Sequence, residues 1–217
     1  TNRGMILPPE GEGLYRHIKI ACTEIEAGEA AVTQSRTLER GNVFLAASEG
    51  ALRCLLLPVL KRYQEKYPGV HLRISNHSTP QAIDVLKNGL ADFAMVTTPA
   101  SVPDSLQSRT VMEIQEVPIC SSAFSGLWDK ELSLQELARH PLICLGPNTS
   151  TFEFYSDLFA QQGLLLKPDI EAATADQILP MVKANLGIGF VPERFVHRED
   201  LGSTVFQISV AEPIPPR

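Results

Sequence analysis

Between residues 42 and 96 the hydrophobic pattern switches repeatedly between strand-like runs and helical spacing. A short continuous apolar run, or strict alternation with polar residues, indicates a strand, whereas spacing of three and four residues indicates a helix. The segments in order are strand-like 43–47, helical 52–67, strand-like 70–75, helical 78–90 and strand-like 93–96. This order predicts a parallel sheet with right-handed crossover helices. Pro58 lies inside the first helical segment, where we expect a local kink.

A similar alternation resumes after a looser, proline-containing stretch over 99–118. The segments in order are helical 134–138, strand-like 142–145, helical 152–163, helical 174–182, and a turn with a buried strand at 187–192. Pro180 lies too deep for a normal first turn, so the fourth of these segments is expected to be bent or to begin late. Two such units joined by extended segments predict an α/β protein of two lobes with a cleft.

Residues 10–40 have a different pattern, which predicts one long helix. The apolar residues lie at steps of four and three, with Gly28 as the weak point: Leu14, Ile18, Ala21, Ile25 and Val32. This 3.5-residue period is typical of a coiled-coil seam, so we expect the helix to pair with a second chain. The alternative is an amphipathic helix that packs on its own domain.

Composition and charge exclude several classes of protein. Of 217 residues, 44% are hydrophobic and 20% are charged, which is the balance of a globular protein rather than a disordered one. The longest apolar stretch, Cys54–Leu60, is far shorter than the ~20 residues of a membrane span, so no membrane partner is expected. A formal net charge of −6 gives little general attraction to DNA, although a local site for a small anion is still open.

The chain carries no motif that commits it to catalysis, to a metal or to a cofactor. Its cysteines form no Cys-x-x-Cys pair, and its histidines lack metal-ligand spacing. Gly187-Ile188-Gly189 lacks the third glycine of a dinucleotide fingerprint and is better explained by close packing of a helix on a strand. We expect Cys120 and Cys144 to be buried apolar residues, the alternative being a redox sensor. Free thiols without a leading secretory signal fit the cytoplasm.

Polar residues recur in loops that follow predicted strands or precede predicted helices. Ligands of open α/β lobes bind at the carboxyl ends of the strands, where helix N-termini offer free N–H groups to a small anion. Any single residue is more simply explained as a helix cap, but the set predicts a binding cleft. The candidates are Ser48, Glu49, Ser78, Thr79, Thr97, Thr98, Asn148, Thr149, Ser150 and Thr174. Glu49 does not suit an anion and is expected to select an amine or hydroxyl, or to face outward.

Several segments match one family in order and spacing. Arg3–Glu12 looks like the wing of a winged helix-turn-helix that runs into a linker helix, with Pro8 at the position of a usual Thr. The other matching segments are Leu57-Pro58, Tyr67-Pro68-Gly69-Val70, Gly89-Leu90-Ala91-Asp92-Phe93-Ala94, Val117-Pro118-Ile119, Leu134-x-x-Leu137, Pro141-Leu142-Ile143, and Val182 to Gly189 with Asn185 at a usual Gly. Together they resemble a LysR-type transcriptional regulator, from the end of its DNA-binding unit through most of its effector domain.

The resemblance implies a fold, a function and partners. The expected fold is two Rossmann-like lobes joined by crossover strands, like a type II periplasmic binding protein, preceded by a linker helix. Residues 1–41 would hold the wing and the dimerisation helix, 42–114 and 203–217 the first lobe, and 115–202 the second. The DNA-reading helix would precede Thr1, and a closing strand and helix would follow Arg217. The expected partners are a small, anionic effector in the cleft, a second or further copies in a homodimer or homotetramer, and DNA through the missing domain.

Two other classes share the two-lobed architecture. A periplasmic-like solute-binding protein would need an export signal and has no use for the seam in 10–40. An enzyme on the same lobes would need a catalytic or cofactor motif, and we find none. We therefore expect a ligand-sensing regulator domain that is not an enzyme and that carries no catalytic residue, cofactor or metal.

Overall fold

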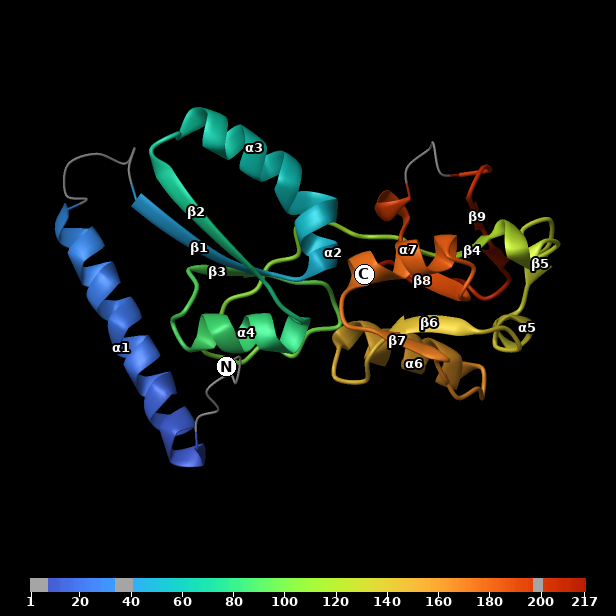
Figure 1. Ribbon diagram of the computed structural model, residues 1–217, viewed down its shortest axis with the longest axis horizontal. Helices are drawn as coiled ribbons and strands as arrows, with labels where there is room; N and C mark the ends of the chain where they lie inside the picture. The colour runs from blue at the N-terminus through green and yellow to red at the C-terminus, as the bar shows by residue number, and fades with distance from the viewer. Residues whose placement is uncertain (1–7, 34–40, 197–200) are drawn as a thin grey trace, which may run out of the picture.

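The computed structural model describes residues 8–33, 41–196 and 201–217. A long helix lies at one end, next to a first lobe, and a second lobe completes the molecule (Figure 1). The carboxyl end of the chain returns to the middle of the molecule, between the two lobes. The expected α/β architecture of two lobes is therefore present.

The first lobe is built on a parallel sheet, as the sequence predicts. Its elements are β1 (Gly41–Ala47), α2 (Glu49–Ala51), η1 (Leu52–Leu56), α3 (Leu57–Lys66), β2 (Val70–Asn76), α4 (Thr79–Lys87) and β3 (Phe93–Met95). The strand order is β2-β1-β3, with β1 in the centre. Leu45 on β1 pairs with Ile74 on β2 and with Phe93 on β3, and both pairings are parallel. Because the strands are parallel, their carboxyl ends meet at one edge of the sheet.

The predicted kink at Pro58 takes the form of a π-helical segment, η1, between α2 and α3. Proline has no N–H to donate to the carbonyl four residues earlier, which here belongs to Cys54. That carbonyl instead accepts a hydrogen bond from Nη1 of Arg194, at 3.2 Å. Arg194 belongs to the second lobe, so the irregularity in this helix provides a contact between the lobes.

The second lobe is built on a mixed sheet. Its elements are β4 (Glu116–Ser121), η2 (Ser122–Phe124), β5 (Glu131–Leu132), α5 (Leu134–Leu137), β6 (Leu142–Leu145), α6 (Ser150–Gln161), β7 (Ile170–Ala172), η3 (Ala175–Gln177), α7 (Ile178–Lys183), β8 (Ile188–Pro192), η4 (Glu193–Phe195), β9 (Val205–Gln207) and β10 (Ser209–Val210). The five strands of the main sheet lie in the order β7-β6-β8-β4-β9. β6 is parallel to β7 and β8, whereas β4 is antiparallel to β8 and β9. As expected from Pro180, α7 begins late, after the short helix η3.

Buried side chains cover both faces of this second sheet. Tyr155, Phe159 and Phe190 belong to one cluster, and Ile178 and Val182 of α7 belong to the other. Gly189 of β8 explains how α7 comes so close, because a Cβ at this position would press on Ile178 and Val182. The prediction that a glycine here lets a helix pack closely on a strand is confirmed for Gly189, whereas a Cβ on Gly187 would meet the backbone of Pro141 rather than a helix.

The returning segment does not follow the predicted domain boundary. Residues 203–217 were expected to complete the first lobe, but β9 pairs with β4 and β10 pairs with β5, both within the second lobe. Burial explains the difference, since Val205 and Ile208 are 0% and 1% exposed in the core of the second lobe. At the end of the chain the backbone of Arg217 pairs with Ile114 through N···O distances of 2.6 and 2.9 Å, and Ile114 is buried in the same cluster as Val117 and Ile119 of β4.

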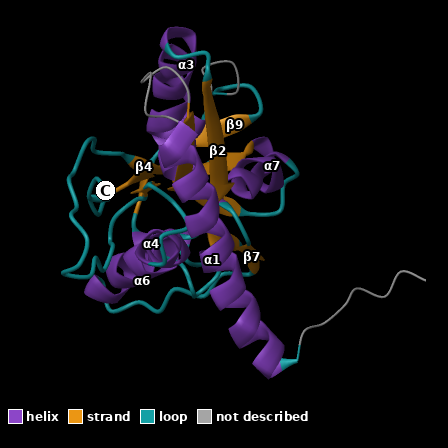
Figure 2. Cartoon of the chain, turned by 90° about the vertical axis from the view of Figure 1, so that its left-hand side faces the viewer, coloured by secondary structure: helices purple, strands orange, loops and turns teal. Residues whose placement is uncertain are grey.

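Helix α1 (Pro9–Thr33) lies across the outer end of the first lobe (Figure 2). The predicted helix is confirmed as far as Thr33, and residues 34–40 lie outside the described part of the chain. Leu14, Ile18 and Ile25 are 61%, 50% and 62% exposed, so the predicted seam does not pack on the first lobe. Ala21 is exposed as well, and the side chain of Val32 lies outside the described part.

A different face of α1 contacts the first lobe. Lys19, Thr23 and Glu26 line a small cavity together with Phe44 and Arg73 of that lobe. On this side α1 therefore lines a cavity with polar side chains, while Leu14, Ile18 and Ile25 of the seam are exposed. The alternative of an amphipathic helix packed by its apolar face on its own domain does not fit this arrangement.

Candidate functional site

A cavity of about 230 Å³ lies between the two lobes and is lined by residues from both. Each lobe contributes the loops at the carboxyl ends of its strands and the first turns of the helices that follow. The loops line the cavity mostly with polar side chains. Leu145, Ile178 and Phe190 add apolar side chains to the lining. This combination of an enclosed space with converging polar groups is typical of a small-molecule site.

Helix N-termini converge on the cavity, and their caps are formed by the predicted residues. Oγ of Ser48 accepts from the N–H of Ala51 at the start of α2, at 3.4 Å. Ser78 forms a capping box with Gln81 at the start of α4. Oγ1 of Thr149 accepts from the N–H of Phe152 in α6, at 3.1 Å. The remaining N–H groups of these first turns, together with the helix dipoles, favour an anionic group in the cavity.

The structure brings together all but one of the predicted site residues. The lining includes Ser48, Glu49, Ser78, Thr79, Thr97, Asn148, Thr149, Ser150 and Thr174. Thr98 does not line the cavity and is exposed to solvent. Thr97, by contrast, is buried and lines the cavity. Thr98 therefore lies outside the candidate site.

Several of these hydroxyl groups already have partners within the protein. Thr79 donates to the carbonyl of Thr97 at 3.1 Å, and Thr149 donates to the carbonyl of Gly146 at 2.8 Å while capping α6. Thr174 precedes η3 without a side-chain cap hydrogen bond. The side chain of Gln177 does not contact Thr174 through a hydrogen bond of this kind, since its Oε1 accepts from the N–H of Ala173 at 2.9 Å. The Thr174 hydroxyl is thus better placed than that of Thr149 to serve a ligand.

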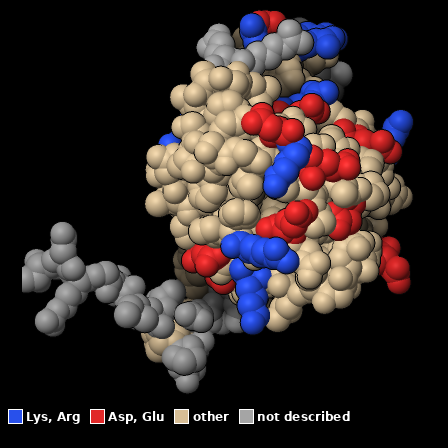
Figure 3. Space-filling view, turned by 90° about the vertical axis from the view of Figure 1, so that its right-hand side faces the viewer, with Lys and Arg blue, Asp and Glu red and all other residues tan. Residues whose placement is uncertain are grey.

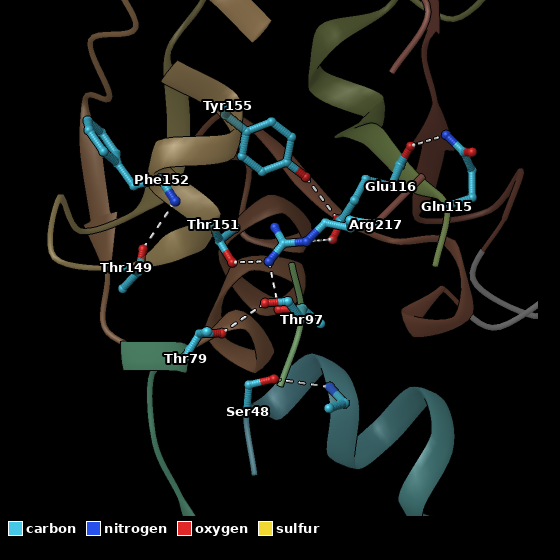
Figure 4. Close-up of polar contacts among 11 residues, drawn as sticks. Ser48, Thr79, Thr97, Gln115, Glu116, Thr149, Thr151, Phe152, Tyr155 and Arg217 are labelled. Carbon is cyan, nitrogen blue, oxygen red and sulfur yellow. Dashed lines mark hydrogen bonds and ion pairs between the residues drawn. The ribbon is translucent and has the colours of Figure 1, made fainter. Parts of the chain in front are cut away.

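Sequence reasoning missed a group of buried polar residues on the cleft wall (Figure 4). Nη2 of Arg217 donates to Oγ1 of Thr97 at 2.6 Å and to Oγ1 of Thr151 at 3.0 Å. Nε of Arg217 lies 3.8 Å from Oε1 of Glu116, and the hydroxyl of Tyr155 donates to Oε2 of Glu116 at 2.8 Å. Arg217 thereby joins Thr97 of the first lobe to Thr151 and Glu116 of the second.

Burial dominates the electrostatics of this group. The side chains of Arg217 and Glu116 are 2% and 4% exposed. Loss of hydration raises the pKa of Glu116, although the Arg217 guanidinium and the Tyr155 hydroxyl act to lower it. Loss of hydration and the Glu116 carboxylate together raise the pKa of Tyr155 well above its usual value. Nε and Nη1 of Arg217 have no hydrogen-bond partner, which is rare for buried donors and is consistent with a site that a ligand completes.

No local pattern in the sequence could have identified this group. Arg217 lies 120 residues from Thr97 and 66 from Thr151 along the chain, so only the fold brings them together. Glu116 is the first residue of β4, after Gln115, and it is buried there, which is an unusual place for a carboxylate. The sequence alone does not show this burial.

Glu49 is a second carboxylate of the cleft. Its Oε2 accepts from Nδ2 of Asn76 at 2.7 Å. Partial burial raises the pKa of Glu49, and the nearby carboxylate of Asp176 raises it further, while Arg53 and Asn76 act to lower it. Two alternatives were predicted for Glu49: it selects an amine or hydroxyl, or it faces outward. Because Glu49 lines the cavity, the first alternative is favoured.

The described part of the chain offers little for other chemistry. Within it, no three His, Cys, Asp or Glu side chains come close enough together to hold a metal ion. Burial raises the pKa of Cys120 to about 11 and that of Cys144 to about 12, so both are protonated thiols near neutral pH. A reactive cysteine is a thiolate, and the redox-sensor alternative therefore has no support in the geometry. None of the helices described is long and apolar enough to cross a membrane.

Comparison with known families agrees with this site and fold. Residues 36–217 match the family model described as the LysR substrate binding domain. The match covers most of the chain, so the protein belongs to the LysR substrate-binding domain family. The resemblance inferred from the sequence motifs is confirmed.

Individual relatives are distant and longer than this chain. It is 28% identical over 196 residues to the HTH-type transcriptional regulator CysB of Burkholderia cenocepacia, covering 87% of this chain and 62% of that protein. It is 24% identical over 192 residues to the probable nitrogen assimilation transcriptional activator of Synechococcus elongatus, with the same coverage of 87% and 62%. The chain thus spans less than two thirds of the length of these curated relatives.

Solved structures support the fold. The regulatory domain of Synechocystis CcmR in complex with 2-PG superimposes with a TM-score of 0.70 at 16% identity, covering 81% of this chain and 84% of that one. At this identity the likeness is one of fold alone. The fold is that of LysR effector-binding domains, which is of the type II periplasmic-binding-protein-like class.

Proposed function

We propose that this chain is the ligand-sensing and dimerisation portion of a LysR-type transcriptional regulator. In this proposal a small metabolite with an acidic group binds in the cleft between the lobes, is not converted, and controls how the full-length protein binds DNA in the cytoplasm. The observation that carries the proposal is the convergence of helix N-termini and of the buried Arg217 on one cavity lined by both lobes. A ligand there contacts both lobes, so its binding changes the free energy of their closure.

The family membership favours a regulator over a solute-binding protein or an enzyme. The exposed seam of α1 adds a second reason, because a solute-binding lobe pair has no need of a helix that presents Leu14, Ile18 and Ile25 to solvent. We assign residues 1–41 to the wing and dimerisation helix, and we propose a homodimer as the smallest assembly, with a homotetramer open.

The surface charge fits a chain that does not itself read DNA. The chain has 25 acidic and 19 basic residues. At the end of the second lobe, acidic and basic side chains alternate over the surface (Figure 3). A surface of mixed charge gives little general attraction to a duplex, so we assign DNA contact to a separate domain of the full-length protein.

The proposal is tested by calorimetry with a panel of small organic acids, beside native mass spectrometry of the purified protein for a retained metabolite. Thr97→Val removes a hydroxyl that faces the cleft, and Thr174→Val removes one that caps nothing. Each is expected to weaken binding by about 1–3 kcal/mol, the cost of an unsatisfied buried polar partner.

Thr98→Val is the matched control, because it is the same substitution on the adjacent, exposed residue. It is expected to leave the affinity unchanged. Equal affinities in all three variants would place the ligand outside this cleft, and turnover of a bound acid would identify an enzyme.

A further inference from the structure

The charged residues of the cleft do not suit a ligand that carries only an acidic group. Apart from His77, the ionisable residues of the lining are Arg217, Glu116 and Glu49. Arg217 and Glu116 form an ion pair and offset each other, so Glu49 leaves the site with one negative charge in excess. A simple acid in this cleft would therefore face an uncompensated carboxylate.

Glu49 has room for a donor from a ligand. It is half-buried at the start of α2, and Oε2 accepts from Asn76. A carboxylate has two oxygens that can each accept more than one hydrogen bond, so Glu49 can accept from a ligand in addition to Asn76. Asp176, on η3 of the second lobe, lies close enough to act on Glu49, so two carboxylates from opposite lobes approach each other there. A cationic group between them would relieve their repulsion as the lobes close.

Arg217 supplies the complementary end of the site. Its side chain is 2% exposed, lines the same cavity, and keeps Nη1 without a hydrogen-bond partner. The first turns of α4 and α6 lie on the same cavity and add N–H groups. An acidic group of a ligand is stabilised at this end by the free Nη1 and by these N–H groups.

One threonine side chain separates the two ends. Oγ1 of Thr97 lies 2.6 Å from Nη2 of Arg217. Cγ2 of the same residue lies 3.3 Å from where a Cβ would stand on Gly50, the residue after Glu49. Glu49 and Arg217 line the same cavity, so a short ligand within it can reach both charges. A cavity of about 150 Å³ holds benzene, so the volume of about 230 Å³ fits roughly nine non-hydrogen atoms.

We infer that the ligand is a small amino acid, a zwitterion whose acidic group lies toward Arg217 and the N-termini of α4 and α6 and whose amine donates to Glu49. This inference rests on the proposed function, since it names the class of metabolite that the cleft senses. It assigns to Glu49 the role of a specificity-determining residue.

The test is calorimetry with matched pairs of ligands that differ only by the amine. The probes are alanine with propionate, 4-aminobutyrate with butyrate, and glutamate with glutarate. The amino member of at least one pair is expected to bind at least tenfold more tightly than its partner. Glu49→Gln keeps the shape of the side chain and an acceptor for Asn76, and it is expected to reduce this preference to less than threefold.

The outcomes separate the inference from the proposed function. Acids that bind without any preference for the amine, or a preference that survives in Glu49→Gln, would overturn the inference and leave the proposed function standing. Absence of binding by all six probes, in a protein that unfolds cooperatively, would overturn both. Thr98→Val serves as the control for substitution near the cleft, and cooperative melting of Glu49→Gln confirms that the variant is folded.

Discussion

Arg217 and Glu116 place a pair of opposite charges in the interior, where each is costly without the other. Removal of one partner from a buried pair leaves an uncompensated charge, which typically costs about 3–5 kcal/mol. Tyr155 donates a hydrogen bond to Glu116 and Thr151 accepts one from Arg217, but Nε and Nη1 of Arg217 have no hydrogen-bond partner. A purely structural ion pair would be expected to satisfy more of its donors, so this group is better explained as part of a ligand site.

The titration of Glu116 gives a pH-dependent test at this scale. Burial, as the largest cause, raises its pKa in the native protein above the ordinary value of 4.5. Above pH 4.5 the unfolded chain therefore loses this proton while the native protein retains it, so the native state binds more protons. The free energy of unfolding then falls as the pH rises through the native pKa, with a slope of at most about 1.4 kcal/mol per pH unit.

Glu116→Gln has no proton to release at this position, so this contribution to the slope is absent. We expect the free energy of unfolding, measured by urea denaturation from pH 4 upward, to fall less steeply in Glu116→Gln than in the unsubstituted protein. Glu49 also has a raised pKa but is present in both proteins, so it cancels in the comparison. Parallel pH profiles would show that Glu116 titrates as it does in the unfolded chain.

At the scale of elements, the close contact between α7 and β8 depends on Gly189. A Cβ there would press on Ile178 and Val182, both of which are buried. Gly189→Ala is therefore expected to lower the free energy of unfolding by about 1–3 kcal/mol through overpacking. The measurement is chemical denaturation of the purified variant.

Gly28→Ala is the control for this substitution. Nothing lies within 4 Å of a Cβ at Gly28, which is an exposed position inside α1. Because alanine is the better helix former, by about 1 kcal/mol, this variant is expected to be as stable as the unsubstituted protein or more so. An undiminished stability of Gly189→Ala would show that α7 can move away from β8 at little cost.

Most helices and strands were predictable from the sequence, but the pairing of β9 with β4 was not. Hydrophobic spacing identifies local structure because it depends on near neighbours, and β1, β2, α4 and β6 follow it. The pairing of β9 with β4 depends on contacts between residues far apart in the chain, which spacing does not report. The predicted boundary at 203 followed the order of elements and missed this pairing.

The site shows the same division between local and distant contacts. Hydroxyl residues such as Ser48, Ser78 and Thr149 were predictable because a helix cap has a local signature. Arg217 and Glu116 were not, because each acquires its role only when the lobes come together. The sequence does not distinguish the two consecutive threonines, of which only Thr97 lines the cavity.

At the scale of the whole molecule, α1 presents its apolar seam away from the first lobe. Ile18 and Ile25 are 50% and 62% exposed, and we expect them to be buried against a second copy. Ile18→Asp combined with Ile25→Asp would place charges in that interface, so a smaller assembly is expected in sedimentation velocity.

The double variant Ile18→Leu, Ile25→Leu keeps the seam apolar and is expected to preserve the assembly. If the aspartate variant sediments like the unsubstituted protein, then α1 is not the interface between copies. Loss of the assembly in both variants would instead indicate that the seam requires β-branched side chains.

The most direct test of the central claim is hydrogen exchange in the presence and absence of the tightest-binding acid of the panel. A ligand held between the lobes contacts the first turns of α2, α4 and α6 and the segment at Thr174, which belong to different lobes. We predict that exchange at these amides slows in both lobes together, because the ligand occupies their free N–H groups and holds the lobes closed. Slowing confined to one lobe, or to α1, would contradict a binding site in the cleft.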